Sequence, residues 1–170
     1  MDKVLLSTGK DDWGTPQKLY DALNKEFGFT MDACADDTNY KHENYYTAET
    51  DGLKADWGGG QTVFCNPPYS KRKKDKPGQE DWIEKAYKES SENGATVVML
   101  IPARTDTIAF HEYILGKAQE IRFVKGRLKF EIDRKANKEA APFPSMIVIF
   151  RGSSTTKTNV EAYIQEKEQK

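Results

Sequence analysis

An apolar segment of this chain, Thr62–Cys65, is followed directly by the tetrapeptide Asn66-Pro67-Pro68-Tyr69. The segment predicts a buried β-strand, so the tetrapeptide is expected to form the turn at its carboxyl end. The Asn66 side-chain oxygen and the Pro67 carbonyl can accept the two hydrogens of a planar amino group, and the two prolines stiffen the turn. The Tyr69 ring could stack on a base, which contributes about 1–3 kcal/mol.

These groups suit methyl transfer to an amino nitrogen, such as that of adenine, whose lone pair is delocalised into a ring. Orientation and proximity would then supply most of the catalysis. In duplex DNA this nitrogen is paired, so the base must leave the stack. Open α/β sheets bind ligands at the carboxyl ends of their strands, where we expect the pocket. The alternative interpretation is a structural turn, because Pro-Pro after a strand is common.

Positive charge is concentrated after this turn, although the net charge of the chain is only -1. Such a balance argues against nucleic-acid binding by bulk electrostatics but allows local phosphate contacts. The alternative for the basic run is a solvated loop. The charged stretch 133–141 is interpreted as a recognition hairpin. Tyr45, Tyr46 and Trp82 are interpreted as core residues, with contacts to DNA or to a cofactor as the alternative. The candidate DNA-binding residues are Lys71, Arg72, Lys73, Lys74, Arg104, Arg127 and Lys129.

The elements that must position these residues follow from hydrophobic periodicity and breakers. A helix is predicted from an N-cap at Thr15, with Pro16 as its first residue, to Gly28, which ends it. Further helices are predicted from about Glu80 to Asn93, over 107–115, and in the polar tail after Gly152. Strands are predicted over 29–34, 62–65, 95–101, 121–124, 128–132 and 145–150.

Apolar strands that alternate with helices predict an α/β fold with a mostly parallel sheet in three layers. The last strands lack long connecting helices, so an antiparallel hairpin is expected at one sheet edge. The 170 residues suit a single domain, which we place at 1–152, followed by a polar tail at 153–170.

Composition indicates a soluble protein, with 37% hydrophobic and 31% charged residues. No apolar run approaches the roughly 20 residues of a membrane span, and the N-terminus lacks a signal-peptide core, so we expect a cytoplasmic protein. Cys34 and Cys65 are interpreted as small buried side chains in a reducing compartment. His42 and His111 show no ligand spacing, and no metal site is expected.

Several segments together resemble the compact phage-type DNA N-6-adenine methyltransferase (Dam) family, in the same order over roughly residues 11 to 151. The most specific is the Asn66-Pro67-Pro68-Tyr69 turn. The resemblance implies a Rossmann-like methyltransferase fold, S-adenosylmethionine as methyl donor and double-stranded DNA as substrate. It also implies a phage or prophage origin and, as in many relatives, action at short palindromes such as GATC. The other segments that carry the resemblance are 13–16, 27–33, 100–107, 126–130 and 141–145.

The resemblance also implies a cofactor site built from several segments. The pair Asp56-Trp57 would contact the adenine of the cofactor, and Asp32 would meet its methionine part. The usual glycines after Asp32 are missing, and 35–39 stands in their place. The cofactor-binding residues implied in this way are Thr15, Pro16, Asp32, Ala33, Ala35, Asp56, Trp57 and Asn66.

Two other functions remain open on the sequence. The same turn could serve a different planar amino group, in RNA adenine, cytosine or a glutamine side chain. The missing glycines also allow a DNA-binding module without a cofactor. In either case we expect a monomer or weak dimer.

Overall fold

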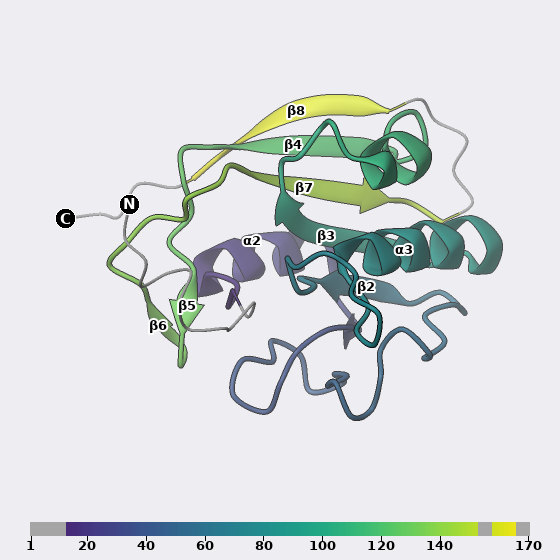
Figure 1. The fold of residues 1–170 in the computed structure, drawn as a ribbon, viewed down its shortest axis with the longest axis horizontal. Helices are drawn as coiled ribbons and strands as arrows, with labels where there is room; N and C mark the ends of the chain where they lie inside the picture. The colour runs from purple at the N-terminus through teal and green to yellow at the C-terminus, as the bar shows by residue number, and fades with distance from the viewer. Residues whose placement is uncertain (1–12, 153–157, 166–170) are drawn as a thin grey trace.

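The computed structural model describes residues 13–152 and 158–165. Its main sheet has six strands in the order β1-β2-β3-β7-β4-β8 (Figure 1). Five strands run in the same direction, and only β7 is antiparallel to its neighbours. The bounds are β1 Met31–Asp32, β2 Thr62–Cys65, β3 Thr96–Pro102, β4 Glu120–Lys125, β7 Ser145–Phe150 and β8 Asn159–Ile164.

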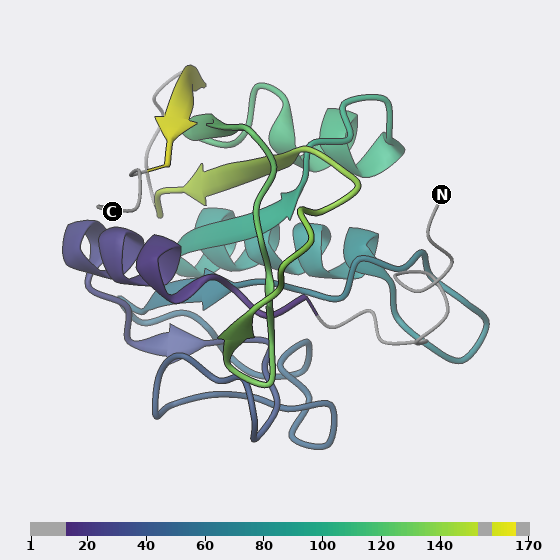
Figure 2. The ribbon, with the colours of Figure 1, turned by 90° about the vertical axis from the view of Figure 1, so that its left-hand side faces the viewer.

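Helices cover both faces of this sheet, which makes three layers (Figures 1 and 2). Helix α2 (Gln17–Phe27) packs on one face, and α3 (Gln79–Asn93) and the π-helical turn η1 (Phe110–Ile114) pack on the other. Successive residues of a strand point to opposite faces, so Val97 belongs to the core under α3 and Val98 to the core under α2. Strands β3 and β7 are buried on both faces, which explains their unbroken apolar sequences.

This architecture confirms the predicted α/β class with a mostly parallel sheet, as expected for a Rossmann-like methyltransferase fold. The antiparallel strand of the main sheet is an inner strand, β7. The antiparallel hairpin is a separate two-stranded sheet formed by β5 (Glu131–Ile132) and β6 (Lys135–Ala136). Positive φ angles at Asp133 and Arg134 form its tight turn.

Three local predictions were wrong. The N-cap of α2 is Pro16 and not Thr15, whose hydroxyl is instead bonded to Asn66. The part of the tail that is described forms β8, a strand parallel to β4, rather than a helix. The strand predicted over 128–132 is regular only at β5, although Leu128 and Phe130 are buried. The rest of the tail, 153–157 and 166–170, lies outside the described residues.

The register of β1 and β2 positions the candidate site. Asp32 is opposite Phe64, so the residues that follow both strands emerge at the same edge of the sheet. Gly28, with φ 67°, ends α2 and turns the chain into β1. Among the described residues, no helix is long and apolar enough to cross a membrane.

Candidate active site

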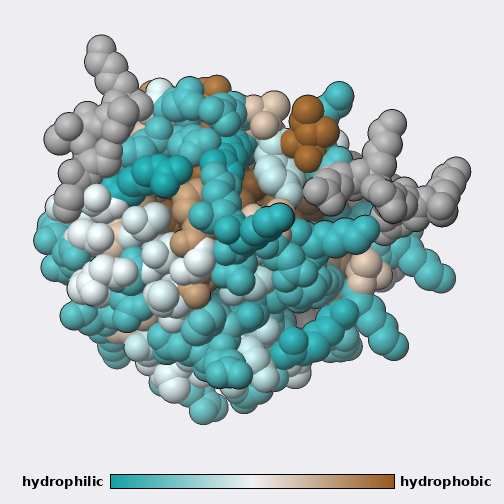
Figure 3. Space-filling view, turned by 180° about the vertical axis from the view of Figure 1, so that it is seen from behind, coloured by the Kyte–Doolittle hydropathy of each residue, from teal (hydrophilic) through white to brown (hydrophobic). Residues whose placement is uncertain are grey.

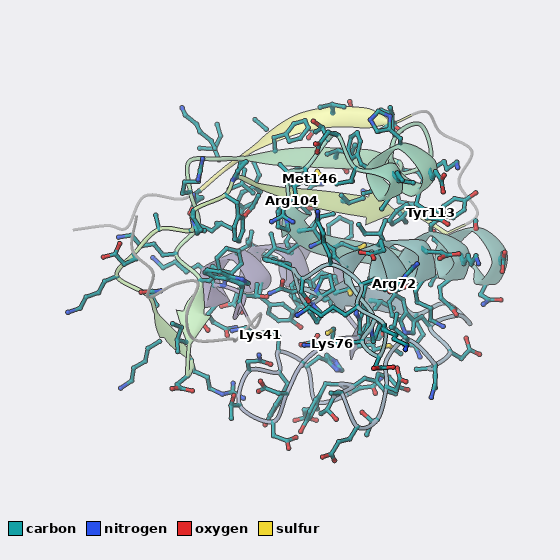
Figure 4. All side chains as sticks on the ribbon, in the orientation of Figure 1. Lys41, Arg72, Lys76, Arg104, Tyr113 and Met146 are labelled. Atoms are coloured by element: carbon teal, nitrogen blue, oxygen red, sulfur yellow. The ribbon has the colours of Figure 1, made fainter. Side chains whose placement is uncertain are left out.

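A cavity of about 320 Å³ lies at the carboxyl ends of β1 and β2. Six residues that the sequence marked as catalytic or cofactor-binding line it: Thr15, Asp32, Ala35, Asn66, Pro67 and Pro68. The structure therefore brings together the acid after one strand and the Asn-Pro-Pro turn after the next. Lys41 and Lys76, both labelled in Figure 4, also contribute to the wall.

The Asn66 side chain is held by hydrogen bonds at both ends of its amide. Its Nδ2 group donates to the Trp13 carbonyl at 2.5 Å and to Thr15 Oγ1 at 2.9 Å. Its Oδ1 atom accepts from the Tyr69 hydroxyl at 2.6 Å. A carbonyl oxygen has two lone pairs, so Oδ1 keeps one acceptor position. The segment before α2 therefore orients the amide, and the oxygen can still bind an amino hydrogen.

Tyr69 lies in the core, which corrects the expectation that its ring is free to stack on a base. The residue is only 6% exposed, and its ring meets Phe130 and Phe143 edge to face. Burial raises the pKa of the Tyr69 hydroxyl well above its usual range, so the group stays protonated and remains a donor. In this structure Tyr69 positions Asn66 from behind.

Asp32 is a buried carboxylate, 2% exposed, at the end of β1. Burial raises its pKa to about 7, and hydrogen bonds from the backbone N–H groups of Lys41 and Cys34 offset part of this rise. A desolvated carboxylate that faces a cavity is stabilised in its charged form by a cation. The site therefore favours a ligand with a positive charge near Asp32.

Lys41 links the loop after β1 to two other elements. Its Nζ atom lies 2.7 Å from Gln17 Oε1 and 3.0 Å from Glu131 Oε2, and the side chains of Lys41 and Glu131 are 4% and 11% exposed. The other oxygen of Glu131 accepts from the Gln17 backbone N–H at 2.8 Å. This buried ion pair therefore joins the cavity wall to the β5–β6 hairpin and to the first residue of α2.

The structure does not bring Asp56 and Trp57 to the cavity, which corrects the cofactor contacts expected for this pair. Both precede β2, so they lie at its amino end, whereas Asn66 follows its carboxyl end. Asp56 Oδ1 accepts from the Gly58 N–H at 2.8 Å. Trp57 is fully buried, and its indole N–H donates to the Gly52 carbonyl. Their roles are a turn and the core.

Two further residues expected at the cofactor do not line the cavity. Ala33 is fully buried between Asp32 and the lining residues that follow, and Pro16 begins α2 behind Thr15. Sequence patterns did not indicate four lining residues of the stretch 41–53: Lys41, Asp51, Gly52 and Leu53. Trp82 of α3, interpreted as a core residue, is buried and also lines the cavity. The stretch 35–60 carries no periodicity, so nothing in the sequence indicated that it folds back over β1.

None of the candidate DNA contacts lines the cavity. Lys71, Arg72, Lys73 and Lys74 are exposed, and Arg72 is paired with Asp81 of α3. Arg104 is exposed just after β3 (Figure 4). Arg127 and Lys129 are exposed on the segment between β4 and β5, where Arg127 reaches the Ala141 carbonyl. Among residues 13–152 and 158–165, no three His, Cys, Asp or Glu side chains form a metal-binding group.

Comparisons with known proteins agree with this geometry. A family described as DNA N-6-adenine-methyltransferase (Dam) matches residues 3–170. A DNA N-6-adenine-methyltransferase of Escherichia phage T1 is 33% identical over 125 residues, which are 73% of this chain and 49% of that protein. One of Haemophilus phage HP1 is 27% identical over 165 residues, 95% of this chain and 90% of that protein. The chain thus spans about half the length of the first relative and most of the second.

Proposed function

The chain belongs to the DNA N-6-adenine-methyltransferase (Dam) family, and we propose that it methylates the exocyclic amino nitrogen of adenine in double-stranded DNA with S-adenosylmethionine as donor. One observation carries the proposal. The buried carboxylate of Asp32 and the oriented amide of Asn66 line the same cavity, at the carboxyl ends of adjacent parallel strands. Open α/β sheets bind ligands at this edge.

The residues present fit S-adenosylmethionine. A cavity of about 320 Å³ lies within the usual range for small-molecule sites. Asp32 suits the cationic methionine part, and Leu53, Pro77 and Trp82 provide an apolar wall for a flat ring. When bound, the cofactor would supply an electrophilic methyl group on a sulfonium, with S-adenosylhomocysteine as the leaving group.

The chain's own groups orient the acceptor. Asn66 Oδ1 accepts one amino hydrogen with its free lone pair, and the Pro67 carbonyl accepts the other. Both bonds turn the nitrogen lone pair toward the methyl group and draw electron density onto the nitrogen. No strongly basic side chain is required before attack, because the amino proton is lost to water after the N–C bond forms. Catalysis by positioning of this kind supplies a large part of the barrier reduction in two-substrate reactions.

The adenine must leave the duplex to reach this turn. We extend the proposal to short palindromic sites such as GATC, which the resemblance of the chain to its family supports. Asn66 and Pro67 would act on any adenine that enters the cavity, so sequence choice must come from groups outside it. Exposed basic residues outside the cavity, among them Arg104 and Lys73, supply candidate contacts.

Incubation with methyl-labelled S-adenosylmethionine and a panel of acceptors tests the proposal. We expect label in N6-methyladenine of duplex DNA, detected by mass spectrometry of the nucleosides. Label confined to RNA, to cytosine or to protein would overturn it. Asn66→Ala should lower kcat by about 100-fold or more, since small misplacements cost this much. Asn159→Ala on the outermost strand is the matched control and should keep wild-type activity.

A further inference from the structure

A second hollow, of about 430 Å³, lies on the side of the molecule that carries α2. We call it the basic groove and define it by Lys18 of α2, Arg127 and Lys129 of the segment before β5, and Tyr163 of β8. Figure 3 shows that the surface on this side is mostly hydrophilic. The groove therefore differs from the candidate active site in both position and lining.

The groove carries three positive charges that are not balanced locally. Within the described residues, no acidic side chain forms an ion pair with Lys18, Arg127 or Lys129. The acid that lines the groove, Glu131, is already bonded to the ammonium of Lys41 and to the first N–H of α2. In a chain of net charge -1, such a cluster creates a local positive potential that attracts anions.

The groove and the active-site cavity share a wall. Gly14, which lines the cavity, exchanges two backbone hydrogen bonds with Glu131, which lines the groove. Figure 2 looks onto this edge of the sheet and shows the β5–β6 hairpin between α2 and the loop that contains residues 71–76. A polyanion that lies in the groove therefore passes the hairpin on its way to the cavity.

We propose that the basic groove binds the phosphodiester backbone of the DNA whose adenine enters the cavity, with Lys18 as a phosphate contact. The proposal rests on the proposed function and adds the path of the duplex across the molecule. It also gives β8 a role, because Tyr163 and Gln165 complete the groove wall. Contacts to phosphate carry no sequence information, so the groove adds affinity on every DNA sequence.

A matched pair of lysines on α2 tests this. Lys18 and Lys25 are both exposed and are seven residues apart, so they lie on the same helix face about 10 Å from one another. Only Lys18 lines the groove. DNA affinity of Lys18→Gln and Lys25→Gln is measured by fluorescence anisotropy with a short labelled duplex of mixed sequence, over a series of salt concentrations.

Lys18→Gln should make the negative slope of log affinity against log salt shallower by about 0.9. The ratio of wild-type to variant affinity should therefore fall about threefold between about 50 and 200 mM salt. Lys25→Gln should keep the wild-type slope. In the triple variant, with Lys18, Arg127 and Lys129 each replaced by Gln, the slope should be shallower by about 2.7. Loss of a cation near the amino end of α2 does not destabilise the helix, so a weaker complex of Lys18→Gln does not reflect unfolding.

Equal slopes for Lys18→Gln and Lys25→Gln, in a protein that methylates DNA, would overturn the proposed binding of DNA in the basic groove. That result would leave the proposed function intact. Absence of methylation and of DNA binding in the wild type would instead overturn the proposed function. Steady-state kinetics give a further readout. Lys18→Gln should raise KM for DNA and keep kcat at saturating DNA, since Lys18 lies outside the active-site cavity.

Discussion

Replacement of Tyr69 by Phe separates two roles for this side chain. If the ring stacks on the adenine, Tyr69→Phe keeps the ring and activity is preserved. If the hydroxyl positions Asn66, the variant loses the 2.6 Å hydrogen bond to Asn66 Oδ1 and the contact with the Leu100 carbonyl at 3.1 Å. The structure favours the second role, because the ring is packed between Phe130 and Phe143.

The expected size of the effect follows from these contacts. A hydroxyl has one hydrogen, and the shorter distance assigns it to Asn66. Loss of one buried hydrogen bond costs about 1 kcal/mol of unfolding free energy, which corresponds to a melting temperature lower by about 2–4 °C in a chain of this size. Asn66 also loses the donor that holds its oxygen in place. If the poorer orientation of Asn66 raises the activation free energy by about 1.4 kcal/mol, kcat falls tenfold.

Thermal unfolding and steady-state kinetics measure both quantities. KM for the cofactor should stay within twofold of wild type, because the fall is in kcat. Tyr87→Phe, on the opposite face of the sheet, is the control for loss of a tyrosine hydroxyl away from Asn66. Unchanged kcat in Tyr69→Phe would refute the positioning role and return the ring to the stacking role.

Four further predictions concern Asp32, Asp56 and Gly14. The pKa of Asp32 is raised in the folded chain to about 7, so the native state binds an extra proton between about pH 4 and pH 7. Wild-type stability should therefore fall as pH rises through this range, and denaturant titrations of Asp32→Asn should lack this fall. Cofactor affinity, measured by calorimetry, should rise through the same pKa, since a cationic ligand prefers the ionised carboxylate. Asp56→Asn should leave cofactor affinity within twofold of wild type, because the Asp56 carboxylate bonds to Gly58 at the far end of β2. A tenfold loss of affinity would restore Asp56 to the cofactor site. Gly14→Ala would place a methyl group 2.6 Å from the Glu131 carbonyl oxygen, so chemical denaturation should show a loss of about 1–3 kcal/mol, and wild-type stability would contradict the observed pairing.

Strands that are buried on both faces were the most predictable elements. The apolar runs of β2 and β7 have the predicted bounds, since such runs have few other stable placements. β8 was missed because its residues are mostly exposed at the sheet edge and carry no apolar pattern. In its pairing with β4, Asn159 is opposite Glu120, which is 39 residues earlier in the chain. Local propensity does not report a partner so far away in the sequence.

The candidate site divides in the same way. Asn66 and Asp32 were found because each directly follows a strand, and the carboxyl edge of a parallel sheet gathers such residues. Asp56 could have been excluded by the same rule, since it precedes β2 and must lie at the other edge. The Lys41–Glu131 ion pair could not be predicted, because its partners are 90 residues apart in an irregular loop and a hairpin. Tyr69 was misplaced because the sequence does not show which way a side chain turns after Pro67 and Pro68.

The inner position of β7 has a consequence for the order in which the chain can fold during synthesis. β7 joins β1-β2-β3 to β4-β8, and these two halves of the sheet have no direct pairing with each other. Strands β1 to β4 leave the ribosome before β7 and β8 leaves after it, so β3 and β4 stay unjoined until residues 145–150 are made. Until then, the edges of β3 and β4 that pair with β7 are unpaired, and such edges are sites for wrong pairing. Closure of the sheet is therefore a late, long-range step, and long-range pairing of this kind folds slowly.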